Sequence, residues 1–226
     1  MRTQEPSPRV LKADRSPVFL DGLHELVERQ TEEHRDGVIA MLAAFDEELH
    51  SNIAQAVSAL IESFRRGGKL LVAGNGGSAA EAQHLASELV GRFRLERRAV
   101  AALALHADTS SLTAIANDYS FNNVYARQIQ TLGSPGDVFV GISTSGQSHN
   151  VVRAAWAARN LGLTTIGYLG QQRGMLAEVV DIPLVIPSSD TSVIQEGHML
   201  LTHLICGLVE ELMFGRKARS SGKEPR

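Results

Sequence analysis

The chain contains five short apolar runs separated by longer helix-like segments, and this alternation constrains its fold more than any other feature. The apolar runs are residues 69–74, 99–105, 137–143, 164–169 and 182–187, and the helix-like segments lie around 79–93, 109–132, 147–162 and 173–179. Short apolar runs are typical of strands buried on both faces. Their alternation with helices indicates βαβ units. We therefore predict an α/β fold with a five-stranded parallel sheet flanked by helices.

A helical extension is expected before the sheet, over residues 18–66. Apolar residues recur there at steps of three and four and form one stripe, which consists of Val38, Leu42, Phe45, Leu49, Ile53, Val57, Leu60 and Phe64. A single helix carrying that stripe is roughly 40 Å long at ~1.5 Å per residue, longer than a small sheet is wide. We therefore expect this extension to pack partly against another subunit. Residues 1–17, with three prolines, are interpreted as a flexible leader.

The last long helix is predicted to follow Asp190, because the Asp-Thr-Ser cluster at 190–192 offers N-cap side chains. It is expected to end near Phe214, where Gly215 supplies a C-terminal stop. Its middle is apolar nearly all round, so it should be buried in the core or at an interface. The sheet and this helix form one predicted domain over residues 67–214, and residues 215–226 are interpreted as a flexible basic tail.

Charge and composition exclude several classes of protein. The net charge is −3, but residues 1–16 carry +2 and residues 216–226 carry +4, so the body between them carries −9. Such a body does not attract nucleic acid. There is no run of 18 apolar residues and no secretory signal, so we expect no membrane partner. The single cysteine, Cys206, fits a reducing compartment, and a cytoplasmic location is the expectation.

Two loops at predicted strand ends have the composition of anion-binding sites. The first is Gly74-Asn75-Gly76-Gly77-Ser78, in which small residues let backbone N–H groups approach an anion at a helix N-terminus. It fits a dinucleotide fingerprint only weakly, since no acidic residue ends the second strand at the required spacing. The second loop is Ser143-Thr144-Ser145-Gly146-Gln147-Ser148, whose four hydroxyls indicate an uncharged phosphate cradle.

Two pairs of polar residues lie on helices expected near these loops. His84 and Glu88 are four residues apart and therefore neighbours on one helix face. Gln195 and His203 lie in the apolar last helix, about 80° apart around it and ~12 Å apart along it. Either Gln195 belongs to an irregular first turn, or the two side chains approach a ligand from different heights. His198, also in this helix, is interpreted as a hydrogen-bonded core residue.

Four motifs in this order resemble the sugar isomerase (SIS) domain family, and within it the phosphoheptose isomerases. They are GNGGS at 74–78, ANDYS at 116–120, ISTSGQS at 142–148 and IQEGHMLLTH at 194–203. The resemblance covers roughly residues 36–214. It implies an enzyme that converts D-sedoheptulose 7-phosphate to D-glycero-D-manno-heptose 7-phosphate through an enediol, in nucleotide-activated heptose biosynthesis. It also implies a homotetramer.

The resemblance further implies roles for individual residues. Substrate binding falls to Asn75, Gly76, Gly77, Ser78, Asn117, Asp118, Ser143, Thr144, Ser145, Ser148 and Gln195. A zinc site would consist of His84, Glu88, Gln195 and His203, nitrogen and oxygen donors that suit this metal. Glu88 and His203 would carry the proton transfers. Ser192 stands where well-known members carry an acidic residue, and Asp190 is close but out of register.

A second interpretation belongs to a different class of protein. Some SIS-domain proteins bind other proteins without catalysis, and the DnaA initiator-associating protein resembles this chain over most of its length. That protein lacks the glutamate of the first helix, the second serine of the STS loop and the late histidine. Because this chain has Glu88, Ser145 and His203, an enzyme is the preferred prediction.

Overall fold

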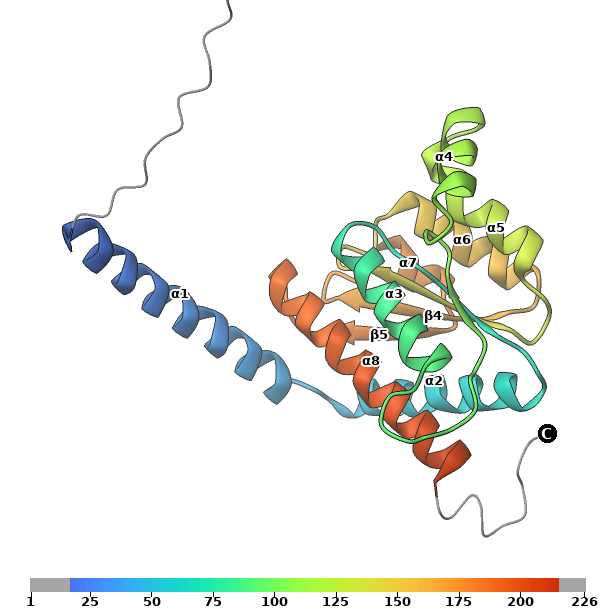
Figure 1. The fold of residues 1–226 in the computed structure, drawn as a ribbon, viewed down its shortest axis with the longest axis horizontal. Helices are drawn as coiled ribbons and strands as arrows, with labels where there is room; N and C mark the ends of the chain where they lie inside the picture. The colour runs from blue at the N-terminus through green and yellow to red at the C-terminus, as the bar shows by residue number, and fades with distance from the viewer. Residues whose placement is uncertain (1–16, 216–226) are drawn as a thin grey trace, which may run out of the picture.

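A single five-stranded parallel sheet forms the centre of the computed structural model, which describes residues 17–215 (Figure 1). The strand order is β2-β1-β3-β4-β5. The strands are β1 (Leu70–Ala73), β2 (Ala102–Ala104), β3 (Val138–Ser143), β4 (Thr164–Gly170) and β5 (Ile182–Ile186). Every pair of neighbouring strands is parallel. The predicted α/β class and the number and direction of the strands are confirmed. Residues 1–16 of the expected leader and 216–226 of the expected tail lie outside the described residues.

Helices cover both faces of the sheet. They are α1 (Pro17–Ala43), α2 (Glu47–Arg65), α3 (Gly77–Val90), α4 (Thr109–Asp118), η1 (Phe121–Asn123), α5 (Val124–Leu132), α6 (His149–Asn160), α7 (Gly174–Val179) and α8 (Thr191–Phe214). Along β1, Leu70 and Val72 join the core shared with α2, α3 and α8, while Leu71 and Ala73 join the core shared with α5, α6 and α7. This alternation explains why the strand sequences are apolar without interruption.

The predicted single helix carrying the stripe from Val38 to Phe64 is wrong, because the structure breaks it between α1 and α2. The Asp46 carboxylate accepts a hydrogen bond from the backbone N–H of Leu49 at 2.9 Å, so it caps a new helix instead of continuing the old one. The α2 part of the stripe is buried against the sheet. Helix α1 projects from the domain (Figure 1), and among its described side chains only Met41 is buried.

Helix α8 begins and ends where the sequence predicts. Asp190 caps it by accepting hydrogen bonds from the backbone N–H groups of Ser192 and Val193, and Gly215 is its C-cap. The Ser192 hydroxyl, which donates to Asp190 Oδ1 at 2.6 Å, and these backbone N–H groups lower the pKa of Asp190 and occupy its carboxylate, so it is a structural cap. The helix is long and apolar enough to cross a membrane, but half of its most apolar window is buried within the domain. It is therefore a core helix of this fold.

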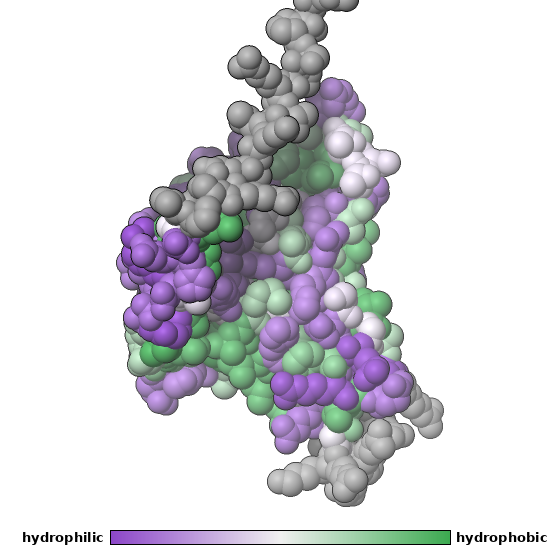
Figure 2. Space-filling view, turned by 60° about the vertical axis from the view of Figure 1, so that its left-hand side comes forward, coloured by the Kyte–Doolittle hydropathy of each residue, from purple (hydrophilic) through white to green (hydrophobic). Residues whose placement is uncertain are grey.

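The opposite face of α8 remains apolar and exposed. Leu204, Leu208 and Leu212 are 41%, 39% and 53% exposed, and they recur every four residues along the helix. Helix α1 adds the exposed residues Leu20, Leu23, Leu26 and Val27. On the side of the molecule from which α1 projects, hydrophobic residues gather in a continuous area (Figure 2). Apolar surface of this kind marks an interaction site.

Candidate active site

Three of the predicted zinc and catalytic residues meet where α3 packs beside α8. The Nε2 atoms of His84 and His203 are 3.2 Å apart, and His84 Nε2 lies 3.3 Å from Oε1 of Glu88. The His84 and Glu88 side chains are 39% and 19% exposed, so a ligand can reach them while the packed helices hold their backbones in place. Residues that are 119 positions apart thus form one group.

Two donor–donor separations within this group are compatible with a shared zinc ion. Zinc–nitrogen bonds of about 2.0–2.1 Å place the ligands of a tetrahedral ion about 3.3–3.4 Å apart. The two measured separations, 3.2 and 3.3 Å, are close to that value. Among the described residues, no group of three or more His, Cys, Asp and Glu side chains is arranged to hold a metal ion. His84 contacts His203 and Glu88 in two separate pairs. The chemistry of the donor set fits zinc, with His84 at its centre.

Gln195 lies beside the N-terminus of α3, whereas His203 lies beside His84, further along that helix. A Cβ atom placed on Gly77 would lie 2.0 Å from the amide nitrogen of Gln195, so the side chain rests directly on the first loop. Gln195 and His203 nevertheless line the same shallow hollow of about 480 Å³, together with Glu81, Glu196, Met199 and Leu200. Gln195 belongs to the regular part of α8. The two side chains therefore approach from different heights, the second of the alternatives raised by their spacing.

Side-chain amides of Asn75 and Asn150 join the first loop to α6, the helix that follows the second loop. Asn75 Nδ2 donates to Asn150 Oδ1 at 2.8 Å, and Asn150 Nδ2 donates back to Asn75 Oδ1 at 2.8 Å. The Tyr125 hydroxyl donates to the Gly74 carbonyl at 2.5 Å, and burial raises the pKa of Tyr125 to about 12. Gly76 has φ +56°, which favours glycine. Asn150 and Tyr125 were missed from the sequence because neither belongs to the loop motifs.

The second loop leaves β3 and opens helix α6. Ser143 is buried, and its hydroxyl lies 3.1 Å from that of Ser148. The Gln147 N–H donates to the Ser145 hydroxyl at 3.2 Å. The first backbone N–H groups of a helix have no carbonyl partner within it, so α6 presents donors and the positive end of its dipole at this loop. Hydroxyls and N–H groups can hold a phosphate here without a cation.

Asn117 and Asp118 end α4 and are exposed. Asn117 Nδ2 donates to Asp118 Oδ1 at 2.9 Å. Between residues 17 and 215, no hydrogen bond or ion pair connects these two residues to the other predicted site residues. The following segment, η1, packs on α6, the helix that the second loop opens.

Phe93 and Glu81 are neighbours of the site that the sequence did not reveal. The Phe93 ring stacks on that of His203, with centroids 5.5 Å apart and planes 11° apart. Phe93 lies in a strongly charged segment, RFRLERR, which gave no sign of a buried ring. His198 is fully buried, as predicted, but the predicted hydrogen bond is wrong: among the described residues neither of its ring nitrogens has a hydrogen-bond partner, and Glu81 Oε2 lies 3.4 Å from its Nδ1.

The contact between Gly77 and Gln195 leads to a prediction. Replacing Gly77 with alanine should displace the Gln195 amide, because the new Cβ would lie 2.0 Å from its nitrogen. The end of a flexible side chain can move, so we expect the melting temperature to stay within a few degrees while zinc affinity falls about tenfold. A competition titration with a chelator measures the affinity. Gly22→Ala is the matched control, since nothing lies within 4 Å of its new Cβ.

Comparisons with known proteins give one family and consistent relatives. The SIS domain family matches residues 33–170. The phosphoheptose isomerase of Geotalea daltonii is 52% identical over 177 residues, which cover 78% of this chain and 92% of its own length. That of Burkholderia pseudomallei (strain 1710b) is 49% identical over 178 residues, 79% of this chain and 89% of its own length. The solved structure of the Neisseria gonorrhoeae phosphoheptose isomerase superposes with a TM-score of 0.75 at 38% identity, covering 84% of this chain and 99% of that one.

Proposed function

The chain belongs to the SIS domain family and, within it, to the phosphoheptose isomerases. We propose that it converts D-sedoheptulose 7-phosphate to D-glycero-D-manno-heptose 7-phosphate and that Glu88 and His203 carry the proton transfers of this reaction. The observation that carries this assignment is the meeting of His84, Glu88 and His203 between α3 and α8. A sugar-phosphate isomerase needs a base and an acid close together, and these residues supply both.

Glu88 is proposed as the carbon base. Its carboxylate removes a proton from C1 of the ketose, the electrons form the C1–C2 double bond of an enediol, and the proton returns at C2. The C2 oxygen gains a proton and the C1 hydroxyl loses one, so the reaction is an isomerisation with no net change in composition. His203 is proposed to move these oxygen protons, since its imidazole can both accept and donate at neutral pH.

Substrate binding is proposed to use both loops. Ser143, Thr144, Ser145 and Ser148 bind the phosphate together with the N–H groups at the start of α6. Asn75, Gly76, Gly77, Ser78, Asn117, Asp118 and Gln195 bind the sugar hydroxyls. The mutual amide pair of Asn75 and Asn150 supports this assignment, because it fixes one loop relative to the other. No lysine or arginine is needed for the phosphate, which suits a body with net charge −9.

Zinc is proposed as the cofactor, held by His84, Glu88, Gln195 and His203. When bound, it would polarise the oxygens at C1 and C2. The spacing of the His84, Glu88 and His203 donors supports this choice of metal.

The activity is tested by incubating the purified protein, supplied with zinc, with sedoheptulose 7-phosphate and resolving the products by chromatography and mass spectrometry. An aldoheptose 7-phosphate is expected. Hexose and pentose ketose phosphates serve as the comparison, and they should react at least about tenfold more slowly in kcat/KM, because enzymes discriminate substrates by this ratio. Complete absence of turnover with every sugar phosphate would point instead to a binding protein.

A homotetramer is proposed as the working assembly, in the cytoplasm. The exposed leucines of α8 and of the projecting α1 support it, because among residues 17–215 they form apolar surface that the fold leaves uncovered. Light scattering at micromolar concentration should give about four times the 24.4 kDa of one chain. A monomeric mass contradicts the proposal.

A further inference from the structure

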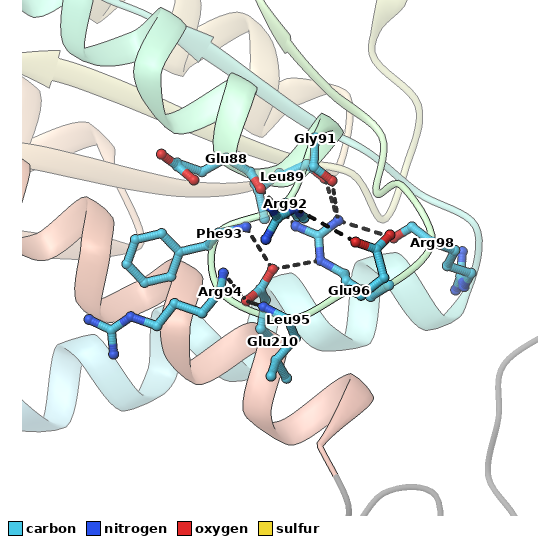
Figure 3. A network of polar contacts seen from close by, with 11 residues as sticks. Glu88, Leu89, Gly91, Arg92, Phe93, Arg94, Leu95, Glu96, Arg98 and Glu210 are labelled. Atoms are coloured by element: carbon cyan, nitrogen blue, oxygen red, sulfur yellow. Dashed lines mark hydrogen bonds and ion pairs between the residues drawn. The ribbon is translucent and has the colours of Figure 1, made fainter.

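The segment after α3 folds around the carboxylate of Glu210, a residue of α8 (Figure 3). Phe93 N–H donates to Glu210 Oε1 at 2.8 Å, and the N–H groups of Arg94 and Leu95 donate to Oε2 at 2.8 and 2.9 Å. Arg97 Nε donates to Oε1 at 2.9 Å. The Arg97 and Glu210 side chains are only 1% and 2% exposed. This is a buried ion pair whose carboxylate is fully hydrogen-bonded.

Glu210 is held in its charged form by these donors. Burial raises the pKa of a carboxyl group, but three backbone N–H groups and Arg97 outweigh it, and the pKa of Glu210 lies below its usual value. A buried charge is retained only where every lone pair is satisfied, since an unpaired charge in the interior is strongly destabilising. The arrangement therefore fixes the path of residues 93–97.

Arg97 also reaches the C-terminal end of α3. Its Nη2 donates to the carbonyl of Glu88 at 2.7 Å, and its Nη1 donates to the carbonyls of Leu89, Gly91 and Arg98 at 2.8, 3.1 and 3.0 Å. The last carbonyls of a helix have no partner within it. The guanidinium supplies that partner at Glu88, so it holds the last turn of α3 together at the residue proposed as the base.

Phe93 carries the same network to His203. With its N–H bound to Glu210, the Phe93 ring stacks on the His203 imidazole at 5.5 Å, and His84 meets that imidazole edge-on at 5.3 Å. The Phe93 ring also packs over Gly207, one turn beyond His203. The His203 imidazole therefore contacts two rings, Phe93 stacked on it and His84 edge-on to it.

We propose that the buried Arg97–Glu210 pair is the positioning device of the isomerase, holding Glu88 through its carbonyl and His203 through the Phe93 ring. The inference rests on the proposed function for the roles of Glu88 and His203. Arg97, Glu210 and Phe93 are positioning residues, since they act on those two groups and not on the substrate. The pair links the segment that follows α3 to α8.

Two variants test this positioning role. Glu210→Gln removes the negative charge and places an amide NH2 group, a donor, against the backbone N–H groups that Glu210 accepts from. Phe93→Leu removes the aromatic ring but keeps an apolar side chain and the backbone N–H. Both should lower kcat at least tenfold with KM within threefold, and should shift the pH profile of kcat. Both should also move the His203 imidazole resonances in NMR spectra of the intact protein, because they remove or displace the stacked ring.

Asp137→Asn is the matched control. Asp137 is also buried, pairs with Lys69 at 2.6 Å and accepts the backbone N–H groups of Lys69 and Ser134, but it lies at the other end of β3. It should lower the melting temperature while kcat of the folded protein and the His203 resonances stay unchanged. Wild-type kcat or unmoved His203 resonances in Glu210→Gln would overturn the inference. If the wild-type protein itself shows no turnover, the proposed function fails, and the resonances alone still decide the positioning role.

Discussion

Replacing Glu88 with glutamine is expected to lower kcat by about 10³-fold, within the range that a positioned acid or base contributes. An amide cannot accept the C1 proton, whereas it nearly keeps the size of the carboxylate. The phosphate cradle of residues 143–148 is untouched, so the dissociation constant for sedoheptulose 7-phosphate should stay within about tenfold of the wild-type value. Steady-state kinetics and calorimetric titration measure the two quantities separately.

The control for this experiment is Glu178→Gln, on the exposed surface of α7 in the other helical layer. It makes the same chemical change without touching the site, so its kcat should equal that of the wild-type protein. If Glu88→Gln retained most of its activity, another group would have to be the carbon base, and His203 would be the first candidate by its position.

Replacing Gly146 with alanine is expected to lower kcat/KM about 10²-fold by displacing the phosphate loop, as small misplacements of binding groups do. Gly146 has φ +66°, and a Cβ there would lie 1.9 Å from the carbonyl oxygen of Arg173. Unlike the end of a side chain, that backbone cannot yield, because Leu176 N–H donates to the Gly146 carbonyl at 2.9 Å and holds the two segments together. Kinetics at varied substrate concentration measure the effect.

Gly136→Ala separates the clash from the cost of the backbone conformation. Gly136 also has a positive φ, +88°, but nothing lies within 4 Å of a Cβ placed there, and it precedes β3 at the end away from the loop. Alanine in the left-handed region costs about 1–2 kcal/mol of stability at either position. We therefore expect Gly136→Ala to lower the melting temperature without changing kcat/KM. An equal loss of kcat/KM in both variants would contradict the role assigned to the second loop.

Sheet and loops were predictable because they depend on local patterns. Short apolar runs such as 137–143, bounded by turn residues, are typical of buried strands, and the loop Gly74-Asn75-Gly76-Gly77-Ser78 is recognised by its own small residues. The break between α1 and α2 was missed because the local pattern there is continuous across the break. The apolar stripe continues through Phe45 into α2, and this continuity outweighed the one residue, Asp46, that signals the start of a new helix.

By itself, the sequence determined the α/β class and the two loops at the strand ends, and it supplied the candidate residues for the chemistry. Only the tertiary structure decided how those residues meet, since His84 and His203 touch through the packing of α3 on α8 and not through any spacing along the chain. The same holds for Phe93 and Glu210, whose contact joins residues 117 positions apart. A side chain's burial and partners depend on which helices pack together, and that packing is a property of the whole apolar core.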